Sequence, residues 1–388
     1  MLDKSQRLIY MDHGATTPMR PEVLESMLPF LKGSYGNPSS IYMLAQEARN
    51  AVDDSRRVIA EIIGARSSEI VFSSGGTESD NAAIKGGLMA MRHLGNHIIT
   101  TSIEHHAVIH VVEHLQLAYD IKVSHVNIKE CGSVDLEHLA QLLEASDEKT
   151  LISLMHINNE IGNMLDLETV AKLAKEHNAL FHSDMVQSVG HFDLNLSEIP
   201  VDFIAAAAHK FHGPKGVGFA FLRKNSKIKS LIFGGGQERG SRAGTEPVHN
   251  IAGMETALIK AQEHLAEERA YIEEIKWYFK EQLEQHIPDV HFNGNCGDGT
   301  KSTYTLLNVC LPVPEDKALM LLFQLDLKGI ACSKGSACQS GSDQGSHVLN
   351  AFLAKDKLNK PSIRFSFSHE NTKEEVDYVV ATLKDFIA

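Results

Sequence analysis

The stretch AAAAHKFHGPKG, residues 205–216, takes a predicted apolar strand directly into Lys210 and then into a Gly-Pro turn. A charge directly after a fully apolar strand is unusual unless the strand ends at a crevice. A lysine at the lip of such a crevice, partly removed from water, becomes a usable amine nucleophile. Most lysines are simply solvated surface residues, so the role of Lys210 depends on the segments that precede it.

Apolar runs alternate with helical periodicity through the first two-thirds of the chain, for example in the helix predicted over Leu167–His177. This βαβ rhythm predicts a mostly parallel sheet with helices on its faces, which is an α/β fold. The predicted strands cover residues 70–73, 97–101, 122–126, 150–155, 179–183, 201–206 and 218–222.

The rest of the chain predicts a second, smaller domain, because 388 residues exceed what one hydrophobic core usually serves. A Gly-rich stretch precedes a long amphipathic helix over Val248–His286, and strand signals follow at 302–310 and 362–368. The expected division is an N-terminal arm (1–15) that joins the small domain, a large domain (16–260) and a small α+β C-terminal domain (261–388).

The composition is that of an ordinary globular protein, with 43% hydrophobic and 22% charged residues. A net charge of −13 argues against a nucleic-acid partner, which needs a basic face. No apolar run reaches the length of about 18 residues that predicts a membrane span, and the N-terminus has no signal or transit pattern, so we expect a cytoplasmic protein. Five widely spaced cysteines favour reduced thiols over a disulfide framework.

Residues 73–81, SSGGTESDN, follow a predicted strand and open a helix. Glycines let a ligand approach the backbone closely, and the free N–H groups of a helix start favour an anion. The segment is neither a Walker loop nor a GxGxxG fingerprint, so a nucleotide is not favoured. Taken alone, a glycine turn with Thr77 or Ser79 as a plain helix cap explains it equally well.

Asp184, in HSDMVQ (182–187), stands at the end of another apolar strand. A carboxylate at this place points into the crevice where α/β proteins bind ligands. It would keep a pyridine nitrogen protonated there, because a partner charge shifts a pKa by roughly 1–3 units, or about 1.4–4 kcal/mol. A helix N-cap is the ordinary alternative for an aspartate at a strand end.

The order of these features along the chain connects them. The anion cup comes first, then the carboxylate of Asp184, and Lys210 follows 26 residues later. An α/β site for pyridoxal 5′-phosphate (PLP) needs this arrangement. A protonated pyridine ring is the electron sink of that cofactor's chemistry. We therefore predict a PLP enzyme in which Lys210 carries the cofactor as a Schiff base.

Practically the whole chain resembles the cysteine desulfurases of the NifS/IscS type, which are PLP enzymes of fold type I and class-V aminotransferase-like. The likeness runs from YMDHGATTP (10–18) to IRFS (363–366). Together the matching motifs are highly specific, and the others are GNPSS (36–40), GTESDN (76–81), NNEIG (158–162), HK with GPKG (209–216), RAGT (242–245) and GSAC (335–338).

The resemblance implies a role for each matching residue. Lys210 would carry the cofactor and move the proton at the substrate Cα, and Asp184 would pair with the pyridine nitrogen. Gln187 would bond the phenolic oxygen of the cofactor, and His105 would stack on its ring and assist proton transfer. The implied phosphate contacts are Gly76, Thr77, His209 and, from the second subunit of a homodimer, Thr245. The implied substrate contacts are Asn159, which also touches the cofactor, Asn37, and Arg364 as a bidentate fork to the carboxylate.

Two positions depart from the family pattern. The family usually has a serine three residues before the lysine, where it donates to the phosphate, and this chain has Ala207. Another donor or a water replaces the serine, or the cofactor is bound less tightly. The second departure is the run Asp12-His13-Gly14-Ala15, where many relatives have an asparagine before the alanine.

Cys338 separates a desulfurase from an ordinary aminotransferase. It lies in a Gly- and Ser-rich loop, 333–346, whose free chain would span roughly 20 Å, which suits a thiol that visits a substrate and then presents its cargo outside. The implied reaction converts L-cysteine to L-alanine, with attack of the Cys338 thiolate on the substrate sulfur and a persulfide left on Cys338. A sulfur-acceptor protein, for iron–sulfur cluster assembly or thio-cofactor and tRNA thiolation, would follow. Cys332 ends an apolar run and is expected to be a packing thiol.

Other functions stay open at this point. Selenocysteine lyase and aminotransferase activities use the same cofactor, and either would survive the loss of Cys338 or require a keto acid. A metal protein is suggested by 21 histidines and by His110 and His114, but two histidines without a third ligand make a poor zinc site. A sulfur-transfer partner that binds without catalysing is the third class. We predict no metal site and no membrane partner.

Overall fold

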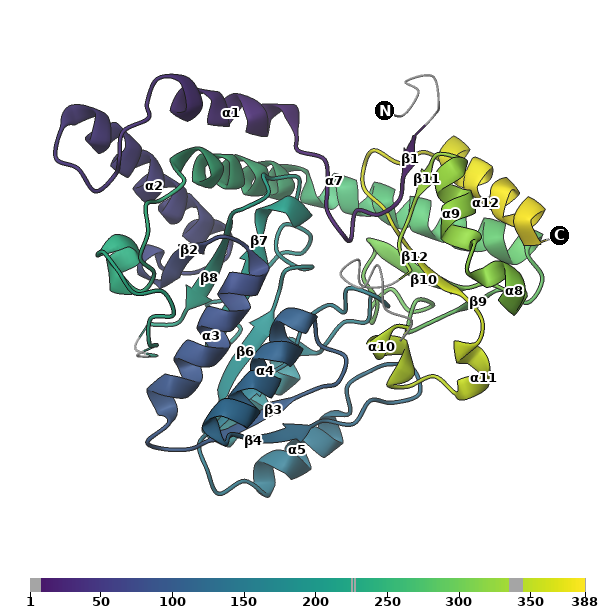
Figure 1. Cartoon of the computed structure of the whole chain (residues 1–388), viewed down its shortest axis with the longest axis horizontal. Helices are drawn as coiled ribbons and strands as arrows, with labels where there is room; N and C mark the ends of the chain where they lie inside the picture. Colours follow the sequence, from purple (N-terminus) through teal and green to yellow (C-terminus); the bar gives the residue numbers. More distant parts are fainter. Residues whose placement is uncertain (1–7, 225, 227, 335–344, 388) are drawn as a thin grey trace.

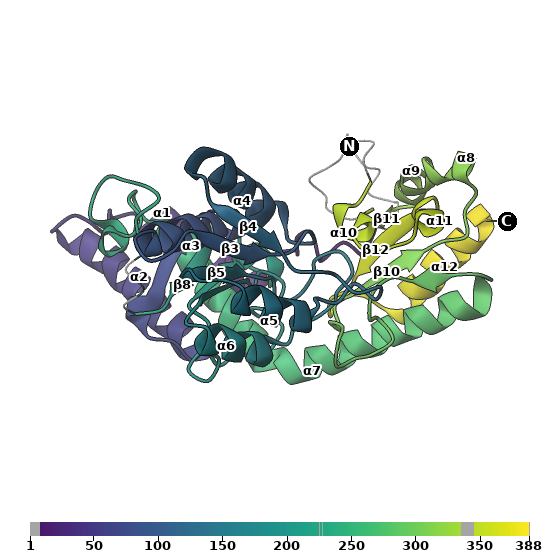
Figure 2. The ribbon, with the colours of Figure 1, turned by 90° about the horizontal axis from the view of Figure 1, so that it is seen from below.

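The computed structural model describes residues 8–224, 226, 228–334 and 345–387. Two bodies lie side by side, and the long helix α7 (Val248–His286) runs along both of them (Figures 1 and 2). The larger body contains a seven-stranded sheet, and the smaller body contains a three-stranded and a two-stranded sheet. The predicted bounds of α7 agree with the observed ones.

The large sheet has the strand order β2-β8-β7-β6-β5-β3-β4. β8 runs antiparallel to β2 and β7, and the other pairs are parallel, so the predicted seven-stranded, mostly parallel sheet is confirmed. The carboxyl ends of β2, β3, β5, β6 and β7 therefore meet at one edge. The strands are β2 (Ile70–Ser73), β3 (His97–Thr100), β4 (Lys122–His125), β5 (Thr150–Ser153), β6 (Leu180–Asp184), β7 (Phe203–Ala207) and β8 (Gly218–Leu222).

The central strands are apolar because helices cover both faces of the sheet. Every residue of β3, β5, β7 and β8 is buried, whereas the edge strand β4 is exposed at both of its ends. One apolar cluster packs α3 and α4 on one face, and another packs α1, α2, α5, α6 and the first half of α7 on the other. These helices are α1 (Pro21–Lys32), α2 (Met43–Ile62), α3 (Gly76–Met91), α4 (His106–Tyr119), α5 (Leu136–Glu144) and α6 (Leu167–Glu176), with short turns η1 (Ser67–Glu69), η2 (Ala208–Lys210) and η3 (Gln237–Gly240).

The small body is built on β10, which pairs antiparallel with β12 and β9, while β1 at the N-terminus pairs in parallel with β11. The strand predicted over 302–310 begins only at Leu306, because the Thr303 hydroxyl lies 3.3 Å from the N–H of Thr305 and favours a turn there. The elements are β1 (Ile9–Tyr10), β9 (His291–Phe292), β10 (Leu306–Cys310), α8 (Glu315–Ala318), α9 (Leu321–Leu327), β11 (Ile330–Ala331), α10 (His347–Asn350), α11 (Lys355–Leu358), β12 (Ser362–Ser366) and α12 (Lys373–Ile387).

The helix α7 belongs to both bodies. Its residues up to Leu258 pack in the core of the large body, and its residues from Ile272 onward pack in the core of the small one. We propose to keep the domain boundary at residue 260, between these two stretches, with the N-terminal arm assigned to the small domain.

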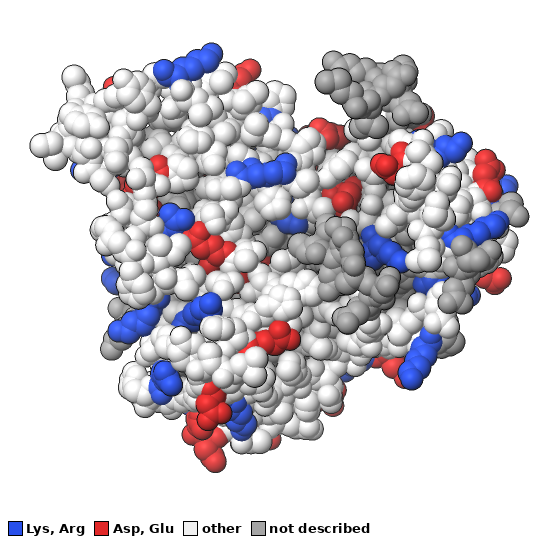
Figure 3. Space-filling model, in the orientation of Figure 1, with Lys and Arg blue, Asp and Glu red and all other residues white. Residues whose placement is uncertain are grey.

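Acidic and basic side chains are interspersed on the face seen in Figure 3. Among the helices that the structure describes, none combines the length and the apolar character that would let it cross a bilayer.

Candidate active site

A cavity of about 250 Å³ opens where the carboxyl ends of the strands of the large sheet face β12 of the small body. The loops and helix starts that follow these strands form its wall, as α/β folds favour. The structure brings most of the predicted site residues together there. Those that line the cavity are Gly76, Thr77, His105, Asn159, Asp184, Gln187, His209, Lys210 and Arg364.

Asp184 is the last residue of β6 and lines the cavity. Its Oδ1 accepts a hydrogen bond of 2.9 Å from the N–H of Val186, and no helix begins at this point, so it is not a helix cap. Burial raises the pKa of Asp184, against the opposing effects of His105, the Val186 N–H and Lys210. A protonated ring nitrogen placed against the Asp184 carboxyl group would offset this rise in pKa and favour the ionised carboxylate.

A second buried carboxyl group, Asp80 of α3, also lines the cavity. Its Oδ1 lies 3.3 Å from His182 Nε2, and both side chains are almost fully excluded from water. Burial and the charge of Asp184 raise the pKa of Asp80 well above its usual value, and burial lowers the pKa of His182 to about 3. His182 is therefore uncharged at neutral pH, and the surroundings of Asp80 disfavour a second carboxylate beside Asp184.

Lys210 ends the short turn η2 that follows β7. Its Nζ donates to the carbonyl oxygen of Gly14 at 2.6 Å, and Gln187 Nε2 donates to the same oxygen at 3.0 Å. Gly14 belongs to residues 12–18, here called the crossing segment because it passes from the small body to the large one. The amine is thus held at the cavity by a segment from the far N-terminal end of the chain.

His105 is the N-cap residue of α4, and its Nδ1 accepts a hydrogen bond of 3.1 Å from the N–H of Ala107. The proton of the neutral ring is therefore on Nε2. Burial lowers the pKa of His105, so an uncharged imidazole faces the cavity. The preceding residue, Glu104, accepts from the Met155 N–H at 2.9 Å, and burial raises its pKa to about 8.

Gly76 and Thr77 begin α3 and line the same cavity. No side chain caps this helix, and the hydroxyl of Ser79 pairs with Ser73 at 2.7 Å instead of bonding the helix start. The N–H groups of the first turn therefore stay available to an anion. A Cβ atom at residue 76 would lie 2.6 Å from Val186 Cγ2, which explains the glycine. The segment is thus an open anion cup and not a plain capped turn.

His209 and Ala207 also line the cavity. His209 Nδ1 lies 3.2 Å from the Thr16 hydroxyl, and burial lowers its pKa to about 4, so the ring is neutral. Ala207 also lines the cavity but has no hydroxyl to donate. The open side of the cup is lined by Lys215 as well, which adds a positive charge where an anion would lie.

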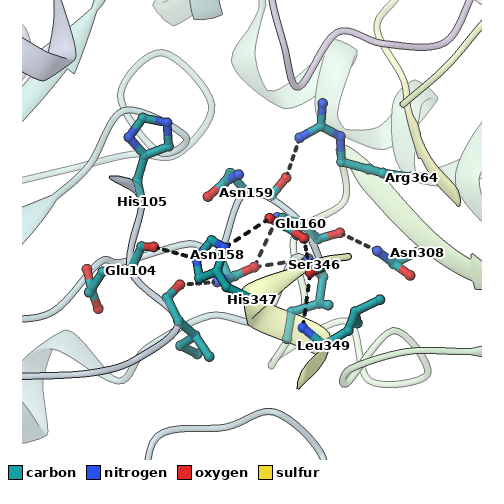
Figure 4. A network of polar contacts seen from close by, with 12 residues as sticks. Glu104, His105, Asn158, Asn159, Glu160, Asn308, Ser346, His347, Leu349 and Arg364 are labelled. Carbon is teal, nitrogen blue, oxygen red and sulfur yellow. Dashed lines mark hydrogen bonds and ion pairs between the residues drawn. The ribbon is translucent and has the colours of Figure 1, made fainter. Parts of the chain in front are cut away.

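Arg364 of β12 reaches the cavity from the small body and is 2% exposed. Its Nη1 donates to the carbonyl oxygen of Asn159 at 2.7 Å, as Figure 4 shows, and its Nη2 pairs with Asp12 Oδ1 at 2.8 Å. The second oxygen of Asp12 accepts from the Ser333 hydroxyl at 3.1 Å. Asp12 thus orients the guanidinium of Arg364. The sequence did not predict this role, although Asp12 lies in the matching motif at residues 10–18.

Two predicted residues that the structure describes, Thr245 and Asn37, are not brought to this cavity. Thr245 is exposed in the loop before α7, and Asn37 is exposed between α1 and α2, where its Oδ1 accepts from the Ser39 N–H at 2.9 Å. Thr245 is expected to serve a second subunit, so a single chain does not test it. Cys338 lies outside the described residues, and its role stays a prediction.

The remaining cysteines and histidines do not suggest a second reactive centre. Cys332 packs against the core of the small body, and burial raises the pKa of its thiol, which agrees with the predicted packing role. His110 pairs with Glu113 at 3.0 Å. Within the part of the chain that the structure describes, no three His, Cys, Asp or Glu side chains are placed to hold a metal ion.

Comparison with known proteins agrees with this geometry. The class-V aminotransferase family matches residues 9–379. A cysteine desulfurase IscS from Dictyoglomus turgidum is 42% identical over 98% of this chain and 95% of its own length. A solved NifS-like protein is 34% identical with a TM-score of 0.89, over 98% of this chain and 99% of its own. The structure of SspA in complex with cysteine is 33% identical with a TM-score of 0.79, over 92% of this chain and 98% of its own.

Proposed function

Because the chain belongs to the class-V aminotransferase family, among relatives named cysteine desulfurases, we propose that it converts L-cysteine to L-alanine and passes the sulfur to Cys338 as a persulfide. The class of activity follows from relatives that are 40–42% identical over 98% of the chain. The observation that carries the proposal is the single cavity that joins Lys210, Asp184 and an anion cup to Arg364.

We propose PLP as the cofactor because the donor set of the cavity fits its parts. The open helix start at Gly76 and Thr77 suits a phosphate, and the carboxyl group of Asp184 suits a protonated ring nitrogen. Burial and the charge of Asp184 disfavour a second carboxylate at Asp80, which fits a cofactor with a single ring nitrogen. Lys210 lines the same cavity, where its amine can reach an aldehyde carbon.

When bound, PLP supplies a protonated ring that accepts the electron pair left on the substrate Cα. Around it, Asp184 would hold the proton at the ring nitrogen, and the neutral imidazole of His105 would pack against the ring. The Lys210 amine removes the Cα proton and later returns it. Gly14 and Gln187 lie next to that amine and orient it, since its Nζ and Gln187 Nε2 share the Gly14 carbonyl.

Arg364 and Asn159 bind the substrate carboxylate in this proposal. A guanidinium offers two parallel N–H groups to a carboxylate, and its Nη2 is already oriented by Asp12. L-cysteine as the substrate is supported by the structure of SspA in complex with cysteine, which has the same fold.

The sulfur then moves without any external oxidant. The Cys338 thiolate attacks the substrate sulfur, the carbon–sulfur bond breaks, and the electron pair stays with the carbon that becomes the methyl group of alanine. The thiol of Cys338 is oxidised to a persulfide as that carbon is reduced. A sulfur-acceptor protein then regenerates the thiol, and iron–sulfur cluster assembly or thiolation of tRNA and cofactors would use the sulfur.

We further propose a homodimer in the cytoplasm. Large apolar side chains are exposed close to the two loops that hold Asn37 and Thr245, with Ile41 99% exposed, Met43 82% and Phe233 86%. Such side chains favour an interface. A second subunit on this face would let Thr245 complete the neighbouring anion cup.

The test combines a spectrum with a product analysis. The purified holoprotein should absorb at about 420 nm, and Lys210→Ala should lose that band. Given L-cysteine, the wild type should form alanine and a persulfide that mass spectrometry locates on Cys338. Cys338→Ala should lose sulfide release, while Cys131→Ala, which removes an exposed thiol, should keep it.

Two results would reject the proposal. Sulfide release at the wild-type rate by Cys338→Ala would remove Cys338 from the reaction. Turnover that depends on an added keto acid would point to an aminotransferase.

A further inference from the structure

Outside the cavity, a polar network joins the start of α10 to two loops of the cavity wall (Figure 4). His347 Nε2 lies 2.9 Å from the carbonyl oxygen of Glu104. The hydroxyl of Ser346 donates to one carboxylate oxygen of Glu160, and the other oxygen lies 3.9 Å from His347 Nδ1. Two consecutive residues of the small body thus contact both loops.

The contacted groups stand directly beside predicted site residues. The Glu104 carbonyl belongs to the peptide bond that leads into His105, and Glu160 directly follows Asn159. A carbonyl oxygen can only accept, so Nε2 of His347 carries a proton and donates. A shift of His347 would therefore move the peptide before His105 and the carboxylate after Asn159 at the same time.

The same two loops are also tied to each other. Asn158 Nδ2 donates to the carbonyl oxygen of Ile103 at 2.9 Å, and its Oδ1 accepts from the Glu160 N–H at 3.0 Å. Asn308 donates to the Glu160 carbonyl oxygen at 2.9 Å. These bonds connect the two loops to each other and to β10. His347 and Ser346, at the start of α10, bond the Glu104 carbonyl and the Glu160 carboxylate.

Burial makes these bonds hard to replace. Glu104 is 1% exposed and Glu160 is 0% exposed, so water has little access to either residue. A buried acceptor that loses its donor keeps its desolvation cost, and the wall then adjusts its geometry to recover a partner. His347 thus reaches both loops from the small body, whereas Ser346 and Asn308 bond the Glu160 loop.

We propose that His347 is a positioning residue that sets the separation of the His105 loop from the Asn159 loop, so that both side chains stay aligned on one bound cysteine. The inference rests on the desulfurase function proposed above, because it assigns His347 to the binding of that reaction's substrate. His347 itself does not line the cavity.

The test compares holoenzymes of three variants with the wild type. His347→Leu removes the donor and fills the space, whereas His347→Gln can place an amide N–H near the position of Nε2. His110→Gln is the matched control, because His110 is an exposed histidine that stacks on His106 at 5.0 Å and has no bond to either loop in the described contacts.

We expect His347→Leu to raise KM for L-cysteine about tenfold and to change kcat by less than about threefold, as one buried hydrogen bond to the wall is lost. The absorption maximum of the bound cofactor should shift, because His105 no longer packs against the ring in the same way. His347→Gln should restore both readings, and His110→Gln should match the wild type.

Three outcomes would overturn the inference. His347→Leu could keep the wild-type KM and spectrum, or it could lower only the melting temperature while the folded enzyme keeps both. His347→Gln could also behave like His347→Leu, which would reject the contact to Glu104. If the wild type forms no alanine from cysteine, the proposed function fails instead, and the spectral comparison still reports on His347.

Discussion

Two side chains of the cavity wall formed by strand ends, Asp184 and His105, are oriented by near neighbours, whereas the crossing segment makes contacts across most of the chain. Asp184 and His105 each bond an N–H two residues further along. In contrast, Asp12 and Arg364 are 352 positions apart, and Gly14 and Lys210 are 196 apart. Local bonds orient Asp184 and His105, which would face the cofactor, and a long-range bond orients Arg364, which would face the substrate.

This difference suggests that the two sides can be perturbed separately. A change in the strand-end wall should alter the chemistry and leave substrate binding nearly intact. A change in the crossing segment or Arg364 should do the opposite. The predictions below test that separation, beginning with the largest effect.

Asp184→Asn removes the negative charge at the ring-nitrogen end and keeps the shape of the side chain. We expect kcat to fall about 10- to 1000-fold, which corresponds to a ring pKa that is lower by roughly 1–3 units. KM for cysteine should change little. Steady-state kinetics checks both values, and Asp193→Asn, a change at an exposed residue nearby, is the control. A KM effect as large as the kcat effect would contradict the separation of the two sides.

Arg364→Lys keeps a positive charge but replaces the fork with a single ammonium group. We expect KM for cysteine to rise about 30-fold through the loss of about 2 kcal/mol of charged hydrogen bonding, with a smaller change in kcat. The cofactor spectrum should stay at its wild-type position. Arg57→Lys, at a residue whose side chain is 55% exposed, should leave both kinetic constants unchanged. A spectrum that changes as much as KM would show that the two sides are not independent.

Buried groups around the cavity should also give the stability two pH limbs of opposite sign. His13, His209 and His212 contact or belong to the crossing segment, and burial lowers their pKa values to about 4, about 4 and about 3. The unfolded chain binds protons at these histidines near pH 6.5 while the folded chain does not, so stability is lost as pH falls from 6.5 towards 4. At pH 5 each group can cost about 2 kcal/mol of unfolding free energy.

Glu104 in the strand-end wall has the opposite sign. Its folded pKa is raised to about 8 by burial, so the folded chain holds a proton that the unfolded chain releases above pH 4.5, and stability falls as pH rises towards 8. Urea unfolding at pH 5, 7 and 8.5 measures both limbs. His212→Gln should weaken the acid limb by the share of one histidine, about 2 kcal/mol at pH 5, and Glu104→Gln should weaken the alkaline limb alone. An acid limb that His212→Gln leaves unchanged would contradict the first assignment.

Ala207→Ser should have the smallest effect and a favourable one. It adds a hydroxyl to the anion cup, where one further hydrogen bond to a charged phosphate would lower the Kd of PLP about tenfold. Absorbance titration of the apoprotein with PLP measures the change. An unchanged Kd would mean that Thr77, His209 or Lys215 already satisfies the phosphate oxygens at this place.

The parts of the molecule that local patterns describe could be predicted. β6 ends at Asp184 one residue beyond its predicted end, because an apolar run followed by polar residues marks a strand end directly. Asp80 lay within a quoted motif, yet its partner His182 is on a strand about a hundred residues later, and no periodicity connects the two. The same holds for Asp12, whose partners Ser333 and Arg364 come from the far end of the chain.

The pairing of β1 with β11 has a consequence for the synthesis of the protein. Ile9 and Tyr10 leave the ribosome long before their partners Ile330 and Ala331. Contacts of such long range form late, and a nascent chain is exposed until they do. The large body can therefore fold while translation continues, but the cavity cannot close around a substrate until Arg364 has emerged. An interrupted chain would hold the cofactor-facing wall without the means to bind cysteine.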